Sequence, residues 1–377
     1  MKKHLWIVLL LVVALAVPVM ASQAVKIFID GQELKTEVPA QIKNGRTLVP
    51  LRAIAEGLGK QVDYDNATKT VKITGLDQLG IVEAITAEWK NAGHAQPGRP
   101  LNYAGTRDSC THCHAGNGFL QYGTDNPYTP QADVAAGETR EEAMPIGCDT
   151  CHSGAGKEML DTGVTDRSVF IKGDYEFGSE TALCISCHNG RRDTAELYQL
   201  WADGKGKTDY PHHGLGALFS GEAGMEYPGV TYARSYAHES VGCTGCHMPK
   251  TEDGYVSHDF AMNPEYIDQT CGSCHVGAKD YTVGGNLKAE LEGMLAELHD
   301  AAVEAVPGAT AIGMSRLQFP FVDAEGKRLD IANVSLEAYV AAYNYYMIKD
   351  DLDNFSQGVH NPQYAKSLIR ESLKKLQ

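Results

Sequence analysis

The stretch Cys243-Thr244-Gly245-Cys246-His247 decides how this chain folds, because it is one of five copies of the pattern Cys-x-x-Cys-His. The five copies together use all ten cysteines of the 377-residue chain. We number them motifs 1 to 5 in chain order: Cys110–His114, Cys148–His152, Cys184–His188, Cys243–His247 and Cys271–His275. Each motif places two thiols three positions apart and an imidazole directly after the second thiol.

This spacing suits covalent haem attachment. Two thiols on one helical turn reach the two vinyl groups of a single haem, and the next residue then lies beneath the iron as an axial ligand. Zinc binding by paired Cys-x-x-Cys or a thioredoxin-like redox site would not require a histidine after every pair. The sequence therefore predicts five covalently bound haem c groups. The attaching cysteines are Cys110, Cys113, Cys148, Cys151, Cys184, Cys187, Cys243, Cys246, Cys271 and Cys274, and the proximal ligands are His114, His152, His188, His247 and His275.

The first residues have the pattern of an export signal. Lys2 and Lys3 precede an apolar run from Leu5 to Val17, and Pro18 and small residues follow. The run is shorter than the roughly 20 residues that a membrane-spanning helix needs, and the pattern is that of a signal peptide over residues 1–24. We therefore expect a secreted, extracytoplasmic protein at the cell wall or cell surface. Ten cysteines in an exported chain would ordinarily indicate disulfides, but the motif spacing argues against them.

The composition limits the classes of partner that we expect, and it differs between two parts of the chain. The formal net charge of −15 repels phosphate backbones, which argues against nucleic acid as a partner. Residues 25–76 contain neither cysteine nor histidine, and their strand-like stretches around the Asn44-Gly45 turn predict a small α+β domain. Residues 77–377 form the second predicted domain, with amphipathic helices from about residue 286. Because five haems would supply much of the core, we expect a mainly α, haem-cored fold with little sheet.

The first domain resembles a known module. The residues that carry the resemblance are Asn44-Gly45-Arg46-Thr47-Leu48-Val49-Pro50-Leu51-Arg52, Glu56-Gly57-Leu58-Gly59 and Thr70-Val71-Lys72-Ile73. They are similar to the copper amine oxidase N-terminal-like domain, a module of exported proteins that is not the copper-binding part of an amine oxidase. Because this domain contains neither cysteine nor histidine, we expect it to be a spacer, docking or wall-contacting module rather than a redox site.

The second axial position of each iron separates an electron carrier from an enzyme. A second imidazole saturates the iron, whereas an open position permits substrate binding. Apart from the proximal ligands and His4 of the signal peptide, eight histidines are candidates: His94, His112, His212, His213, His238, His258, His299 and His360. His112, inside motif 1, is expected to point outward. His299 lies within a predicted helix, where a ligand role and an ordinary surface or core role are equally plausible.

A second resemblance narrows this set. His238-Glu239 followed by motif 4, then Met248-Pro249-Lys250, Ser257-His258-Asp259 and Gly358-Val359-His360-Asn361-Pro362, resembles pentahaem cytochrome c nitrite reductases and their multihaem relatives. The resemblance implies that His238, His258, His360 and His94 are distal ligands. The fifth ligand is then His212 or His213, of which we favour His213; His212 and His299 are the less favoured candidates.

Departures from that family favour an electron carrier. His114 stands where the family's catalytic haem usually has lysine, and the stretch after motif 3 lacks the family's Glu and Tyr. We therefore predict electron transfer along bis-histidine haems, in extracellular or cell-surface respiration. The alternative is a nitrite or hydroxylamine reductase with one open haem, using His212 or His213 together with Arg99 or Arg107. Expected partners are a membrane quinol-oxidising complex, other cytochromes or an external metal or mineral acceptor, and the sequence also allows a homo-oligomer or filament.

Overall fold

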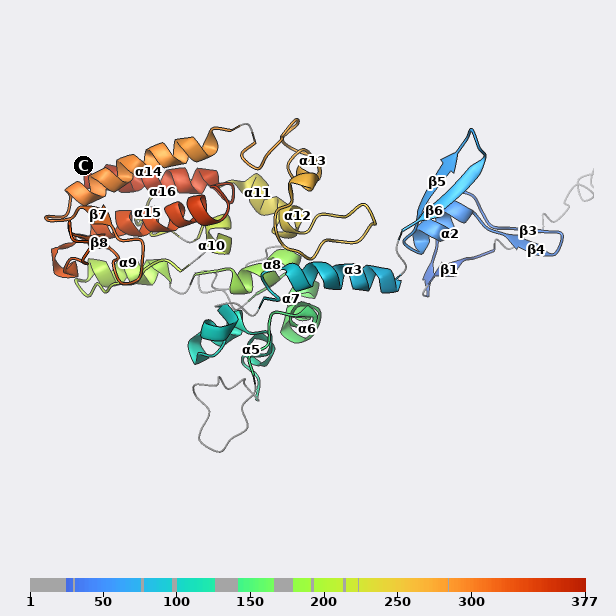
Figure 1. Ribbon diagram of the computed structural model, residues 1–377, viewed down its shortest axis with the longest axis horizontal. Coiled ribbons are helices and arrows are strands. Elements are labelled where there is room, and N and C mark those ends of the chain that lie inside the picture. Colours follow the sequence, from blue (N-terminus) through green and yellow to red (C-terminus); the bar gives the residue numbers. More distant parts are fainter. Residues whose placement is uncertain are drawn as a thin grey trace, which may run out of the picture. The chain divides into compact units, whose positions relative to one another are not determined.

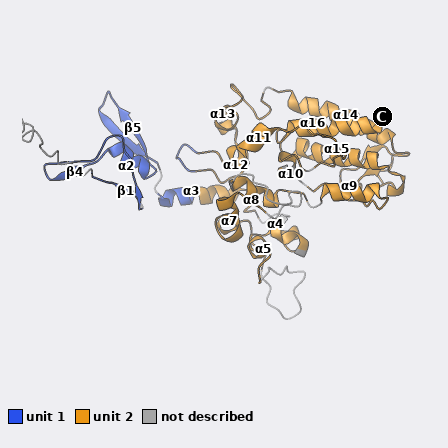
Figure 2. Cartoon of the chain, turned by 180° about the vertical axis from the view of Figure 1, so that it is seen from behind, with its two compact units in different colours: residues 1–83, 251–255 blue, residues 84–250, 256–377 orange. Residues whose placement is uncertain are grey.

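The computed structural model (Figure 1) describes residues 25–29, 31–75, 78–96, 100–125, 142–165, 179–190, 193–212, 215–222, 224–283 and 285–377. The predicted signal peptide lies outside these residues. The chain divides into two compact units, one of residues 1–83 with 251–255 and the other of residues 84–250 with 256–377 (Figure 2). In the described part of the chain, no helix is long and apolar enough to cross a membrane.

Where the structure describes the first unit, it shows three two-stranded antiparallel pairs, one helix between them and the first residues of another. The pairs are β1 (Phe28–Ile29) with β2 (Gln32–Glu33), β3 (Gln41–Lys43) with β4 (Arg46–Leu48), and β5 (Gln61–Asp65) with β6 (Thr70–Thr74). Helix α2 spans Leu51–Gly57. Asn44 and Gly45 both have positive φ, 53° and 75°, which is the conformation that a two-residue hairpin turn requires. The predicted α+β character of this region is therefore confirmed.

The middle of the second unit is built from short helices separated by loops, and α3, which is named first, starts in the first unit. They are α3 (Gln78–Asn91), η1 (Pro100–Ala104), η2 (Asp108–Cys110), α4 (Thr111–His114), α5 (Gly116–Gln121), α6 (Cys148–His152), α7 (Gly154–Thr162), α8 (Ser179–Cys187), α9 (Thr194–Ala202), α10 (Leu215–Phe219), α11 (Tyr236–Val241), α12 (Thr244–His247), η3 (Pro264–Tyr266) and α13 (Ile267–Thr270). Motifs 1 to 4 lie on or at the ends of α4, α6, α8 and α12, and motif 5 follows α13. Helical turns therefore carry the cysteine pairs, as haem attachment requires.

Three longer helices form the C-terminal part of this unit. They are α14 (Leu287–Glu304), α15 (Leu336–Asn354) and α16 (Pro362–Leu376), and they pack against one another. Side chains cap the starts of α15 and α16: Ser335 Oγ accepts from the amide of Ala338, and Asn361 Oδ1 accepts from that of Tyr364. Leu291, Leu295 and Leu298 line the buried face of α14 at helical spacing.

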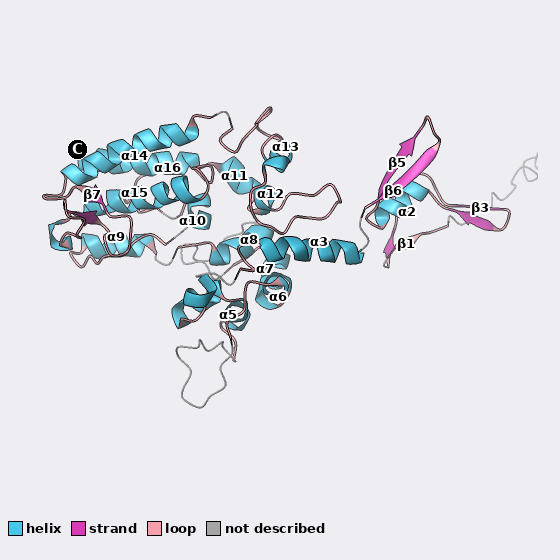
Figure 3. Ribbon diagram, in the orientation of Figure 1, coloured by secondary structure: helices cyan, strands magenta, loops and turns pink. Residues whose placement is uncertain are grey.

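An aromatic contact joins α9 to the C-terminal helices. Trp201 of α9 stacks on Tyr339 of α15, with ring centres 4.0 Å apart. Within the described residues of the second unit, the named strands are β7 (Ala311–Ile312) and β8 (Phe321–Val322) (Figure 3). The fold is mainly α with little sheet, as the sequence predicted.

Candidate haem-binding sites

The structure contains no disulfide between any of the ten motif cysteines. Motif 2 illustrates the local geometry, because α6 begins at Cys148 and ends at His152. One turn of helix thus presents both thiols and the following imidazole on the same side. These thiols stand for the thioether sulfurs of attached haem.

Each motif histidine lies opposite a different histidine from outside the motifs. The pairs, with the distances between ring centres, are His114 with His212 (6.2 Å), His152 with His258 (6.2 Å), His188 with His94 (5.9 Å), His247 with His360 (6.3 Å) and His275 with His238 (6.3 Å). We call these ligand pairs 1 to 5, after the motif that each contains. Pair 1 contains His114, pair 2 His152, pair 3 His188, pair 4 His247 and pair 5 His275.

The spacing within the pairs is the spacing across a metal ion. An imidazole nitrogen binds a metal at about 2.0–2.1 Å, and the ring centre lies about 1 Å behind that nitrogen, so two imidazoles on one iron have centres about 6 Å apart. Aromatic rings in ordinary packing also reach about 4.5–7 Å. Ordinary packing, however, would not join every motif histidine to a separate partner. The residues present therefore fit five bis-histidine haem sites.

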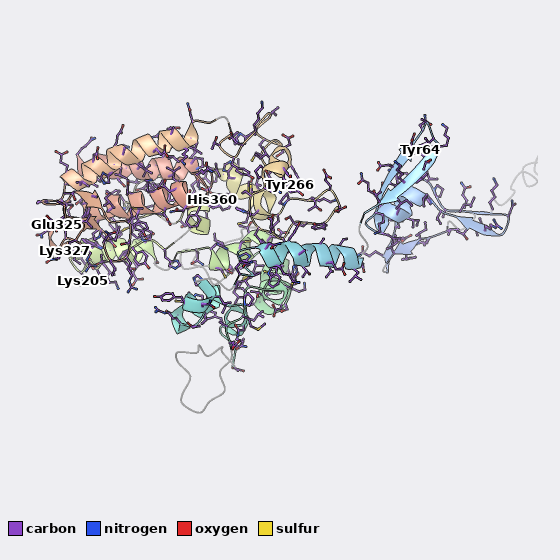
Figure 4. All side chains as sticks on the ribbon, viewed as in Figure 1. Tyr64, Lys205, Tyr266, Glu325, Lys327 and His360 are labelled. Atoms are coloured by element: carbon purple, nitrogen blue, oxygen red, sulfur yellow. The ribbon has the colours of Figure 1, made fainter. Side chains whose placement is uncertain are left out.

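Hydrogen bonds hold the rear nitrogens of several of these imidazoles. Nδ1 of His238 lies 2.9 Å from the carbonyl oxygen of Val359, and Nδ1 of His258 lies 2.7 Å from that of Val256. Nδ1 of His360 faces the carboxylate of Asp351 at 3.0 Å. A partner at Nδ1 fixes the tautomer and leaves Nε2 for the metal. Figure 4 labels His360, at the end of the C-terminal helices near α10 and α11.

Burial keeps the central imidazoles neutral. Together with the neighbouring imidazoles of His94, His247, His360 and His114, burial lowers the pKa of His188 to about 4. Burial also lowers the pKa of His94 and of His247. A histidine must be neutral at the nitrogen that binds a metal. The electrostatics at His94, His188 and His247 therefore favour the ligating form.

The remaining histidine candidates have different surroundings. His112 packs against the ring of Tyr122 at 5.0 Å, and His299 pairs with Asp300 at 3.1 Å and with the ring of Tyr345 at 5.5 Å. His213, which we favoured from the sequence, lies outside the described residues, and the structure places His212 opposite His114 instead. Of the two arginines named for an enzyme, Arg99 is also outside the described residues, while the guanidinium of Arg107 lies over the ring of Tyr103.

Neighbouring motifs approach one another closely. The thiol of Cys113 lies 3.8 Å from the carbonyl oxygen of Ser186, and that of Cys187 lies 3.9 Å from the carbonyl oxygen of His112, so motifs 1 and 3 are in contact. The thiols of Cys184 and Cys243 are neighbours, so motifs 3 and 4 also approach closely, and the nearby Cys243 thiol together with burial raises the pKa of Cys184.

Sequence reasoning missed several residues that hold the ligand pairs. The carboxylate of Glu88 on α3 accepts the backbone amide of His258 at 2.7 Å. Asp351 and Phe260 contact ligand imidazoles directly. Glu88 lies six positions before His94 on a predicted helical stretch, but no sequence signal connected it with His258. These residues act through the folded arrangement of segments that are distant in the chain.

Comparison with known proteins follows the same division of the chain. Residues 230–377 match the family model of cytochrome c552, and residues 19–78 match that of the copper amine oxidase N-terminal domain. The two resemblances noted from the motifs are thus confirmed. The matches support a c-type cytochrome, a class whose haem is bound covalently.

One curated relative is named cytochrome c-552, from Aliarcobacter butzleri (strain RM4018). It is 26% identical over 165 residues, which cover 35% of this chain and 33% of the relative. The match thus spans about a third of the length of that protein.

Proposed function

We propose that this chain is an exported five-haem c-type cytochrome that transfers electrons through bis-histidine haems. The observation that carries the proposal is the set of five ligand pairs, in which every motif histidine has its own partner at 5.9–6.3 Å. Haem iron in such a site supplies a one-electron couple. A haem held between the two imidazoles of a pair would transfer electrons and would leave no position for a substrate.

The contacts between motifs support a conducting path. Motif 3 touches motif 1 through Ser186 and motif 4 through Cys243. Helix α7, which follows motif 2, packs against α8, which carries motif 3. Motif 3 therefore acts as the branch point of the path. Its proximal histidine, His188, is surrounded by imidazoles of three ligand pairs, as expected for an interior relay: His94, His247, His360 and His114.

The exposure of two motifs supports them as the sites where electrons enter and leave the protein. Cys148 of motif 2 and Cys274 of motif 5 are the exposed motif cysteines, whereas the other eight are partly covered. We assign motifs 2 and 5 to exchange with partners, which we expect to be a membrane quinol-oxidising complex, other cytochromes or an external metal or mineral acceptor. The acidic chain suits partners with a basic docking face. The signal-like N-terminus supports action outside the cytoplasm, and the first unit supplies contact with the cell wall.

An enzyme would need one motif histidine that faces an open position. A nitrite or hydroxylamine reductase built on motif 1 would keep the side of the iron opposite His114 free for its substrate. His212 lies on that side, 6.2 Å from His114. This geometry favours the carrier over the reductase.

Carbon monoxide binding tests the proposal. CO binds ferrous haem only where an axial position is open, so the reduced wild-type protein should keep its absorption spectrum under CO. His212→Ala removes one distal ligand, and about one fifth of the haem absorption should then shift. His299→Ala is the matched control, and its spectrum should remain that of wild type. A CO-dependent shift of about a fifth of the wild-type signal would overturn the carrier function.

A further inference from the structure

Phe260 has a backbone conformation that bulky residues rarely adopt. Its φ is +58°, in the left-handed region that glycine enters freely and that a side chain with a Cβ avoids. Such a conformation persists where surrounding contacts hold it, and it often marks a functional position. The contacts of Phe260 explain what holds it.

The ring of Phe260 lies against the distal imidazoles of two different ligand pairs. Its centre is 4.7 Å from that of His94 and 5.7 Å from that of His258, and both contacts are edge-to-face. His94 belongs to pair 3 and His258 to pair 2. An edge-to-face contact restricts rotation of an imidazole about its bond to the metal. One ring therefore restricts the planes of two axial ligands.

The backbone of the same residue holds a third ligand. The carbonyl oxygen of Phe260 lies 2.9 Å from Nδ1 of His247, the proximal histidine of pair 4. With Nε2 directed to the iron, Nδ1 donates to this carbonyl and fixes the ring orientation. The left-handed φ matters here, because it directs the side chain toward pairs 2 and 3 while the carbonyl faces pair 4.

We infer that Phe260 is a positioning residue that sets the imidazole orientations of ligand pairs 2, 3 and 4 together. This inference rests on the proposed bis-histidine function and extends it. The ring planes make angles of 32° in pair 2, 60° in pair 3 and 38° in pair 4. The angle between axial imidazole planes governs the electronic ground state of a low-spin ferric haem. Phe260 thereby tunes three neighbouring sites of the electron path from one position.

Electron paramagnetic resonance of the oxidised holoprotein tests this inference, because each low-spin signal reports the angle between its two imidazole planes. Phe260→Leu removes the aromatic edge but keeps the carbonyl, so the signals of pairs 2 and 3 should shift and those of pairs 1 and 5 should stay. Phe260→Trp keeps a ring of different size and should move the same two signals. Unchanged signals in both variants, or equal changes in all five, would overturn the inference.

Phe219 provides the matched control. Its ring is buried and lies 6.4 Å from the imidazole of His360, so it contacts a ligand of pair 4. Phe219→Leu should shift the signal of pair 4 and leave those of pairs 2 and 3. The EPR signals of each variant are compared with those of the wild type, so the experiment tests Phe260 even if the wild type binds CO. If the carrier function is wrong, the CO experiment shows it. If the role of Phe260 is wrong, the EPR signals of the variants and the wild type show it.

Discussion

The carboxylate of Asp351 lies 3.0 Å from Nδ1 of His360 and is only 1% exposed. Ser356 fixes the other carboxylate oxygen with a hydroxyl at 2.5 Å. Among the Nδ1 partners of the ligand histidines described above, the others are backbone carbonyls, so pair 4 differs in having an anion behind its distal imidazole. A buried anion at this position increases the electron density of the imidazole and favours the ferric state.

Asp351→Asn should raise the reduction potential of one haem, that of motif 4. The ferric site carries one more positive charge than the ferrous site, so removing the anion destabilises the ferric form. If about 1 kcal/mol of charge-assisted bonding differs between the two states, the potential rises by about 40 mV, because 59 mV is tenfold in a one-electron equilibrium. Spectroelectrochemical titration measures this shift.

Asp353 supplies the control for that titration. It lies on the same helix, is 40% exposed and pairs with Lys349. Asp353→Asn also removes one negative charge from α15, but from a side chain that pairs with Lys349. Equal shifts in the two variants would mean that overall charge sets the potential and that the hydrogen bond to His360 does not.

Tyr339→Phe should loosen the distal ligand of motif 1. The Tyr339 hydroxyl donates a hydrogen bond to the carbonyl oxygen of Asp209 at 2.5 Å and accepts one from the backbone amide of Asp209 at 3.1 Å. These two bonds anchor the segment that leads to His212. Losing the hydroxyl leaves buried backbone groups unpaired, at about 1–3 kcal/mol. Denaturant unfolding should show this loss, and the reduced variant should bind some CO. A destabilised variant that excludes CO would show that other contacts hold His212.

Attachment motifs can be recognised in the sequence, whereas distal ligands cannot be assigned to particular motifs from it, for a physical reason. Covalent attachment constrains neighbouring residues, so a motif such as Cys148–His152 can be recognised locally. A distal ligand such as His94 meets its motif only through the fold. Two adjacent histidines, His212 and His213, cannot be ranked from spacing, since either can swing over the same haem face. The role of Phe260 depends on its positive φ, and no residue preference predicts that for phenylalanine.

Gly216→Ala should disturb motif 3. A methyl group at Gly216 of α10 would lie 2.1 Å from the carbonyl oxygen of His188 and 3.1 Å from Ile185 Cγ1, both belonging to the motif 3 region. Since the oxygen is backbone, α10 must move away, at about 1–3 kcal/mol for overpacking. We expect lower stability in denaturant unfolding and a shifted low-spin signal from pair 3.

Gly293 is the matched glycine for this experiment. It lies inside α14, and a methyl group there would meet nothing within 4 Å. Gly293→Ala should stabilise the protein by about 0.5–1 kcal/mol, because alanine is the better helix former. If both variants were neutral, the close approach of α10 to His188 would not be a constraint in solution.

Glu226→Gln should become more stable than the wild type as the pH rises above the ordinary carboxyl range. Burial raises the pKa of Glu226, although its hydrogen bond from the Tyr364 hydroxyl at 2.7 Å and the charge of Arg234 oppose this effect. Between the ordinary carboxyl value and the raised one, the folded state holds more protons than the unfolded state. The free energy of unfolding therefore falls as pH rises through that window. Glutamine keeps an oxygen acceptor for Tyr364 and removes the titration.

Unfolding of the holoprotein at several pH values measures this effect. The wild type should lose stability relative to Glu226→Gln as pH rises from the ordinary carboxyl range toward neutrality, and the two should converge in acid. Tyr364→Phe deletes the donor that lowers the pKa of Glu226, so it should widen the pH window of the loss. The difference in pH dependence between the wild type and Glu226→Gln should persist at high salt, because burial rather than surface charge causes it. Parallel curves for wild type and Glu226→Gln would show that the carboxyl group remains hydrated in the folded state.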